Sequence, residues 1–267
     1  MTRGWLLYTR ENAVKNEWFI SSLCAELGKF DIRLALKILP ENGDFDKAFT
    51  EELPDFAIVR SICPKANEWL QSRGIRVFNN AKTAQIACDK WQTYQFCKAH
   101  TIPVLPTFQE PPKGIDYPLV MKTTDGHGGA EVFWIADEEE YQKRRVELTN
   151  RAYILQQPSD TLGKDMRIYA IGGQIVGAVL RSSTSDFRSN FSLGGRVENA
   201  TVTKEQRAIV KTLYQALQFD YIGVDFLPHK GGWVLNEIED SAGARMLYAC
   251  TEIDIIKLYA EYIVNSI

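Results

Sequence analysis

Two short apolar segments near the end of this chain carry two carboxylates, a third directly follows them, and a glycine turn separates the segments. The segments Tyr221–Leu227 and Gly232–Ile238 have strand-like compositions and pair around His229-Lys-Gly-Gly. Glu237 and Glu239 are two residues apart, so their side chains share one face of a strand, and Asp225 can point the same way. Three like charges on one face repel each other, which favours a bound divalent cation over a structural role. We therefore predict an antiparallel strand pair whose metal ligands are Asp225, Glu237 and Glu239.

A glycine-rich loop precedes these segments in the chain. Lys122 follows the apolar residues Leu119-Val120-Met121, and the loop continues as Thr123-Thr-Asp-Gly-His-Gly-Gly129. Glycines allow backbone N–H groups to approach anionic oxygens, and a lysine beside them suits a polyphosphate. Alone the loop is a weak signal, because an ordinary β-turn has the same composition. Combined with the carboxylates, it predicts a nucleotide–metal site within residues 90–245. His127 in this loop can contact phosphate, and we expect no catalytic role for it.

Several arginines lie on or just beyond a predicted hairpin at residues 165–181, which turns at Gly172-Gly173. An arginine beside a phosphate–metal site can neutralise the charge that builds up on a transferring phosphoryl group. The alternative for each is a surface arginine paired with a carboxylate, and only their grouping argues against it. The group comprises Arg167, Arg181 and Arg188, with Asn190 close behind.

Composition narrows the class of protein. The 267 residues are 45% apolar and 24% charged, an ordinary profile for a soluble globular chain. The net charge is −3, so the chain lacks the excess of basic residues that would favour binding to nucleic acid. The chain has no signal-peptide pattern and no apolar stretch of membrane-spanning length. Its five cysteines are scattered, as expected for free thiols in a reducing compartment. We expect a cytoplasmic protein that binds neither membranes nor nucleic acids.

The first 80 residues alternate between strand and helix patterns, which predicts a small parallel α/β sheet. The expected strands are Trp5–Thr9, Ile32–Ile38, Asp55–Arg60 and Ile75–Phe78, and the expected helices are Asn16–Lys29 and Ala66–Arg73. Further along, helices are predicted at residues 81–98, at Thr203–Leu217 and at Glu252–Ile263. A G-x-G-x-x-G motif does not follow the first strand, so dinucleotide binding has little support.

This order of segments resembles the ATP-grasp superfamily, and within it the RimK-like carboxylate–amine ligases, over residues 80–245. The matching motifs are Asp89-Lys90, Val120-Met121-Lys122, Gly126–Gly129, Ile154–Pro158, Asp165-Met166-Arg167 and Asp186–Asn190 with Gly194-Gly195. The resemblance implies an α/β protein with the ATP-grasp fold. It places a small parallel pre-ATP-grasp domain at 1–80 and the ATP-grasp domain at 81–267. The latter would comprise a lid subdomain at about 105–158 and a C-terminal subdomain at about 159–267.

The resemblance also implies roles for individual residues. Lys90 and Lys122 would bind ATP phosphates, the backbone at Gln157 and Pro158 would hold adenine, and Asp165 would accept hydrogen bonds from ribose. Arg188 and Asn190 would contact the phosphates and the reacting group as catalytic residues. The implied cofactors are ATP and two Mg²⁺ or Mn²⁺ ions held by Asp225, Glu237 and Glu239. The remaining cofactor-binding candidates are Gly128, Gly129 and Ser189.

Two positions depart from the family pattern. The last metal position is usually Asn in this family, and here it is Glu239, which adds a negative charge. The acidic residue of the adenine hinge is replaced by Gln157. Adenine binding should survive the second change if the hinge contacts run through the backbone.

The implied reaction is ADP-forming ligation. A small-molecule or peptide carboxylate becomes an acyl phosphate, and an amine then displaces phosphate to give an amide; glutamate is one candidate substrate. Arg60, Arg167 and Arg181 are candidates to hold the substrate carboxylate, and a structural role is an equal alternative for Arg60. Two other functions stay open, namely a small-molecule kinase of the same architecture and a non-catalytic nucleotide-binding module. The oligomeric state is not determined by the sequence.

Overall fold

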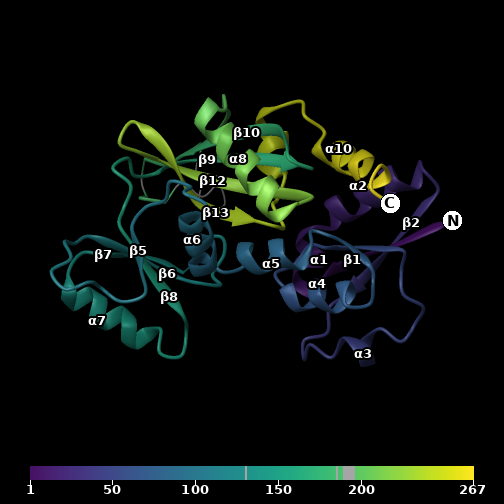
Figure 1. Ribbon diagram of the computed structural model, residues 1–267, viewed down its shortest axis with the longest axis horizontal. Helices are drawn as coiled ribbons and strands as arrows, with labels where there is room; N and C mark the ends of the chain where they lie inside the picture. The colour runs from purple at the N-terminus through teal and green to yellow at the C-terminus, as the bar shows by residue number, and fades with distance from the viewer. Residues whose placement is uncertain (130, 185, 189–195) are drawn as a thin grey trace.

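Three β-sheets organise the molecule, and each belongs to a different lobe (Figure 1). The computed structural model describes residues 1–129, 131–184, 186–188 and 196–267. The N-terminal lobe contains a parallel sheet of order β2-β1-β3-β4, as the strand–helix alternation predicted. Its elements are β1 (Thr2–Tyr8), α1 (Arg10–Lys15), α2 (Glu17–Gly28), β2 (Ile32–Ile38), α3 (Phe45–Ala48), β3 (Phe56–Val59), α4 (Pro64–Gln71) and β4 (Arg76–Phe78).

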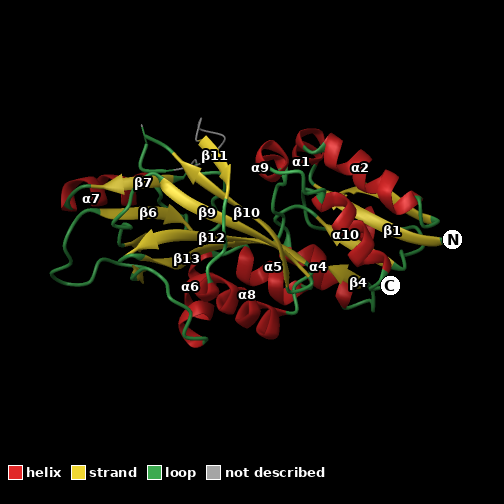
Figure 2. Ribbon diagram, turned by 90° about the horizontal axis from the view of Figure 1, so that it is seen from above, coloured by secondary structure: helices red, strands yellow, loops and turns green. Residues whose placement is uncertain are grey.

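The central lobe contains a five-stranded antiparallel sheet of order β11-β10-β9-β12-β13. The predicted hairpins form around Gly172-Gly173 and after His229, and helix α8 begins at the predicted threonine with a capping box. The apolar face of α8 packs against this sheet (Figure 2). The elements are β9 (Lys164–Ile171), β10 (Gln174–Ser182), β11 (Arg196–Asn199), α8 (Lys204–Leu217), β12 (Tyr221–His229) and β13 (Gly232–Glu239).

The lid contains a smaller antiparallel sheet of order β5-β8-β6-β7, with helix α7 beside it (Figure 1). It has its own small core, and the buried residues of that core are Leu119, Met121, Ile135, Tyr141 and Leu155. Asp137 caps α7 by accepting a hydrogen bond from the Glu140 backbone N–H. The elements are β5 (Thr107–Phe108), β6 (Leu119–Thr123), β7 (Val132–Ile135), α7 (Glu138–Glu147) and β8 (Tyr153–Gln156).

Two helical predictions differ from the structure. The single helix expected at 81–98 is two helices, α5 (Ala81–Ala87) and α6 (Lys90–Ala99). The chain is extended at Asp89, whose side chain accepts from the Gln92 N–H and caps α6. The C-terminal helix α10 (Ile255–Val264) is preceded by a short helix, α9 (Arg245–Cys250), that the sequence pattern did not indicate. The break at Asp89 turns the first residue of α6, Lys90, toward the lid loop.

One hydrophobic core joins the N-terminal lobe to the central lobe and to the end of the chain. It combines Phe19 and Leu23 of α2 with Tyr169 and Tyr221 of the central sheet and with helix α10. Figure 1 shows α2 and α10 side by side, with both chain termini in this lobe.

Asn79 reinforces this junction from the end of β4. Its side chain accepts from the backbone N–H groups of Asp220 and Tyr221 and donates to the carbonyls of Tyr221 and Asp240, at 2.6–3.1 Å. The two lobes are therefore packed and hydrogen-bonded as one unit.

Candidate active site

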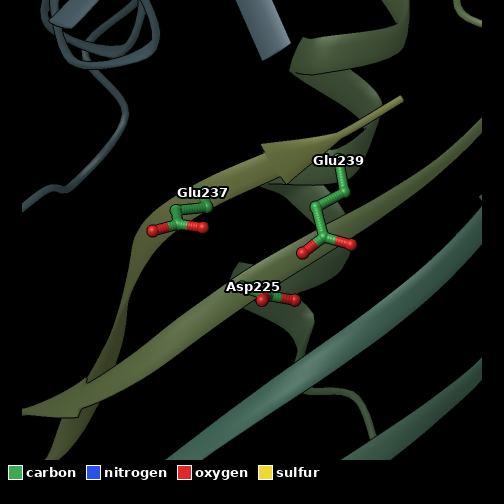
Figure 3. Close-up of side chains that lie close together, drawn as sticks. All are labelled: Asp225, Glu237 and Glu239. Atoms are coloured by element: carbon green, nitrogen blue, oxygen red, sulfur yellow. The ribbon is translucent and has the colours of Figure 1, made fainter. Parts of the chain in front are cut away.

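The three predicted metal ligands lie together in the structure. Asp225 on β12 is directly opposite Glu237 on β13, and Glu239 follows two residues later on the same face. Ligand oxygens of the three side chains all lie within 4.8 Å of one another. Figure 3 shows the three carboxylates turned toward one another from the two strands. A cluster of carboxylate oxygens matches the donor set of a hard divalent cation.

Two buried arginines alternate with these carboxylates. Arg167 on β9 is opposite Asp225 and forms two hydrogen bonds with it, both at 2.7 Å, and it also donates to Glu239. Arg181 on β10 binds both Asp165 and Asp225. The carboxylates therefore do not need a metal to offset their mutual repulsion, contrary to what the sequence had suggested, because the arginines already compensate their charges. Both arginines were candidates to hold substrate, and here their guanidinium groups are engaged by the protein's own carboxylates.

The absence of a side chain at Gly223 makes room for one of these arginines. Gly223 faces Glu239 across the strand pair, and a Cβ atom there would lie 3.3 Å from Arg167 Cδ and 2.9 Å from the Ala242 side chain. The ion pair between Arg167 and Glu239 thus depends on how strands β9, β12 and β13 are aligned in the folded sheet.

The electrostatics of the cluster follow from this arrangement. Burial alone would raise the pKa of Asp225, but Arg167 and Arg181 outweigh burial and hold it well below its usual range. Burial raises the pKa of Glu239. The pKa of Glu237 is lowered because Lys90 and Lys122 outweigh its burial. The carboxylates of the cluster thus already interact with cationic side chains of the protein, and a metal ion that binds there would share them with those side chains.

The two predicted phosphate lysines approach the cluster from the lid side. Lys122 on β6 is buried and donates to Gln156 Oε1 at 2.8 Å and to Asn236 Oδ1 at 2.9 Å. Its burial lowers the pKa of the ammonium group to about 8. Lys90 Nζ lies 3.9 Å from Glu237 and donates to the Gly126 carbonyl.

Sequence reasoning did not select Gln156 and Asn236, which position Lys122. Both are neutral amides and lack the charge pattern that identified their neighbours. The position of Asn236 immediately before Glu237 was the available signal.

The glycine loop lies over the site. Gly128 and Gly129 have φ of +70° and +77°, a left-handed conformation that favours glycine. Arg188 donates to the Gly129 carbonyl at 2.7 Å and pairs with Asp186. The predicted catalytic arginine therefore contacts the phosphate loop. The other predictions in that segment, Ser189 and Asn190, lie outside the described residues, as do Gly194 and Gly195.

A first cavity runs between the lid and the central sheet. Its walls include both lysines, the glycine loop, the hinge residues Gln157 and Pro158, and the carboxylate cluster. The Gln157 N–H donates to the Pro106 carbonyl, and proline has no N–H, so these two residues offer a base their carbonyl oxygens. Carbonyls can accept from the exocyclic amino group of adenine. Asp165 also lines this cavity, and both of its oxygens accept from Arg181.

A second cavity of about 400 Å³ opens between the N-terminal and central lobes. Asn12, Asn16 and Arg60 line it from the N-terminal lobe, and Arg245 lines it from α9. The Arg60 side chain is buried, donates to the Ala242 carbonyl at 2.7 Å, and lies against the rings of Phe19 and Tyr221. These contacts match the structural role that the sequence left open for it.

The two cavities meet beside the carboxylate cluster. Five residues line both of them, namely His127, Gly128, Arg167, Arg181 and Glu239. A group bound in the first cavity can therefore be reached by a molecule in the second.

Within the described part of the chain, no helix combines the length and apolar character needed to cross a bilayer.

Comparison with known proteins places these features in context. A family description, the RimK-like ATP-grasp domain, matches residues 89–263. The chain is 27% identical over 251 residues to an uncharacterized protein of Mycoplasma pneumoniae, covering 92% of this chain and 86% of that protein. It is 28% identical over 243 residues to human N-acetylaspartylglutamate synthase A, covering 81% of this chain and 61% of the synthase.

Solved structures show the same architecture. The D-alanine–D-alanine ligase of Bacillus anthracis, complexed with ATP, superimposes with a TM-score of 0.73. The alignment covers 99% of this chain and 97% of that one at 15% identity, so it bears on the fold.

Proposed function

The chain belongs to the RimK-like ATP-grasp family, and from this membership we propose that it is an ATP-dependent, ADP-forming carboxylate–amine ligase. In this reaction a substrate carboxylate takes the γ-phosphoryl group of ATP to become an acyl phosphate. An amine then displaces phosphate and an amide forms.

The observation that carries the proposal is the meeting of the two cavities. The first cavity has the groups that a magnesium nucleotide needs, which are buried lysines, a glycine loop and clustered carboxylates. The second cavity is separate from it and reaches the same cluster from the N-terminal lobe. A ligase needs this arrangement, because a carboxylate and an amine must both reach the terminal phosphate end of the nucleotide.

The residues fit the proposed cofactors. Asp225, Glu237 and Glu239 would hold one or two Mg²⁺ or Mn²⁺ ions, and their oxygen donors suit either metal. A bound divalent cation would supply charge neutralisation between the phosphates. Lys122 and Lys90 would bind phosphate oxygens directly, Arg188 would lie over them with the glycine loop, and Gln157 and Pro158 would accept from adenine.

Arg245 is the better candidate to hold the substrate carboxylate. It lines the second cavity, its side chain is exposed, and it forms no ion pair with another described residue. By contrast, Arg60 is covered by the aromatic rings of Phe19 and Tyr221, and Arg167 and Arg181 are bound to carboxylates. We propose small amino-acid or peptide carboxylates as substrates, with glutamate among the first to test because the human relative's name contains it.

A trapping experiment tests the proposal. The protein is incubated with ATP, Mg²⁺, hydroxylamine and, in turn, L-glutamate, N-acetyl-L-aspartate and D-alanine. We expect one acid to give a hydroxamate together with equal amounts of ADP and phosphate, because hydroxylamine captures an acyl phosphate. A stable phosphorylated product formed without phosphate release would instead identify a kinase. Nucleotide binding without turnover over a wider panel of acids would indicate a non-catalytic module.

A further inference from the structure

His127 stands at the junction of the two cavities. It lies in the glycine loop between Gly126 and Gly128, and its side chain lines both the nucleotide cavity and the second cavity. The side chain is exposed to these spaces, and its ring makes no hydrogen bond or ion pair with another described residue. Its two nitrogens are thus available to a molecule that spans the junction.

The other ionisable groups shared by the two cavities are already engaged. Arg167 is bound to Asp225 and Glu239, and Arg181 is bound to Asp165 and Asp225. Glu239 belongs to the carboxylate cluster and faces Arg167. Among the described residues that line both cavities, His127 alone combines a free ring nitrogen with a pKa that is ordinarily near neutrality.

Contrary to the expectation from the sequence, we infer that His127 is the general base that takes a proton from the attacking amine. This inference rests on the proposed ligase function and assigns to that site a residue for its second half-reaction. An amino group is protonated near neutral pH and has no lone pair for attack, so the reaction needs a group that removes a proton at the place where amine and acyl phosphate meet.

The surroundings of the ring support this role. Partial desolvation by the surrounding groups and the nearby Lys90 ammonium lower the pKa of His127, although the ring still faces the cavities, while Glu237, Asp125 and Glu131 act in the opposite direction. The lowered pKa favours the neutral ring, which is the form that accepts a proton. Contact with phosphate alone would be better served by a charged ring.

His127 takes one proton from the ammonium group, and the nitrogen lone pair attacks the carbonyl carbon of the acyl phosphate. The C–N bond forms, and the C–O bond to the phosphate breaks with its electron pair leaving on phosphate. Of the three ammonium protons, one stays on the amide nitrogen, one passes through His127 to solvent, and one leaves with phosphate as HPO₄²⁻.

The test compares two nucleophiles in the His127→Gln variant, with His100→Gln as a matched control outside both cavities. The carboxylic acids are L-glutamate, N-acetyl-L-aspartate and D-alanine. The first nucleophile is an amino acid, L-glutamate or D-alanine. The second is hydroxylamine, which is largely unprotonated at pH 7. We expect amide formation by His127→Gln to fall by about 100-fold at pH 7, the usual size of a general-base effect. The loss should shrink as the pH rises toward the amine pKa, because more of the amine is then free base. Hydroxamate formation, ADP binding and the midpoint of thermal unfolding should match the His100→Gln control.

Three outcomes would overturn the inference. Equal loss of amide and hydroxamate would place His127 in phosphate binding and leave the ligase function intact. Unchanged amide formation in His127→Gln would exclude a base role. The third comes from NMR titration of the wild type with Mg²⁺ and ADP, with His127→Gln used to assign the signal. An imidazole still protonated at pH 8 would exclude the role whichever substrate is used. A wild type that makes no hydroxamate from any carboxylic acid would instead remove the proposed function itself.

Discussion

Asp225 and Glu237 both belong to the carboxylate cluster, yet their surroundings differ. Asp225 is buried and accepts three hydrogen bonds from two arginines, whereas Glu237 is partly exposed and lies 3.9 Å from Lys90. Removing the charge of Asp225 therefore affects both the fold and the site, while removing that of Glu237 affects mainly the site. The two substitutions separate the stability role from the proposed metal role.

We predict that Glu237→Gln and Asp225→Asn both lower ADP production by more than about tenfold, ~1.4 kcal/mol of barrier. Glu237→Gln should change the free energy of unfolding by less than about 1 kcal/mol, because its pair with Lys90 is long, at 3.9 Å, and glutamine keeps the shape of the side chain. Asp225→Asn should cost about 3 kcal/mol, because two buried arginines each lose one of their two carboxylate partners. Denaturant titration and an ADP assay measure the two quantities. A fully active Glu237→Gln enzyme would contradict the metal assignment.

In the proposed site, Lys122 would link nucleotide binding to pH. Its pKa of about 8 in the folded protein lies below the ordinary value of 10.5. Between these values the unfolded chain holds the extra proton, so this lysine makes the nucleotide-free protein more stable as pH rises through that window. Phosphate bound beside the ammonium group would raise the pKa again, so ADP binding just above pH 8 should take up a proton.

Calorimetry in two buffers of different ionisation enthalpy measures this uptake. We expect it in the wild type and in the exposed control Lys98→Met, and we expect it to vanish in Lys122→Met. Equal heats in both buffers for the wild type would show that Lys122 stays charged throughout.

For individual residues, the sequence predicted that Asp225, Glu237 and Glu239 point to the same face of the sheet, because side chains two residues apart on a strand share a face. It did not predict that Arg167 and Arg181 bind those carboxylates. Their partners depend on the register of β9 against β10 and β12, which residues far apart in the chain determine. Local periodicity contains no information about that register.

At the scale of secondary-structure elements, Asn79 joins the end of β4 to the start of β12 and the end of β13. We predict that Asn79→Ala lowers the free energy of unfolding by about 3 kcal/mol or more, because buried N–H and C=O groups lose their partners. The exposed Asn199→Ala should change it little. Denaturant midpoints compare the two, and equal midpoints would show that water replaces the lost bonds.

Helices and strands with a strong hydrophobic periodicity were predictable from the sequence, whereas the residues at which a helix is interrupted were harder to predict. The helix expected at 81–98 contains a good N-cap at Asp89, but a continuous helical pattern outweighed it. Helix α9 was not predicted because it has only six residues. Its two buried side chains are too few to define a helical periodicity in the sequence.

At the scale of the whole molecule, the shared core predicts that the N-terminal and central lobes unfold together. Leu23 of α2 is fully buried in that core, whereas Met121 belongs to the separate core of the lid. We expect Leu23→Ala to cost about 2–5 kcal/mol and to speed hydrogen exchange equally in β1 and β12. Met121→Ala should speed exchange mainly in the lid. Faster exchange confined to β1 in Leu23→Ala would show that the lobes unfold independently.

The alternation of arginines and carboxylates has a consequence for assembly of the protein in the cell. Many metal-binding sites hold repelling ligands together only after the ion arrives, so their folding waits for metal. Here each of the three clustered carboxylates already lies beside a cationic side chain, and the chain can reach its final form before any ion binds. We therefore expect the chelator EDTA to leave the thermal unfolding midpoint unchanged, and a clear drop would contradict this. Metal supply would then regulate how much of the enzyme is active, and the amount of folded protein would be set independently.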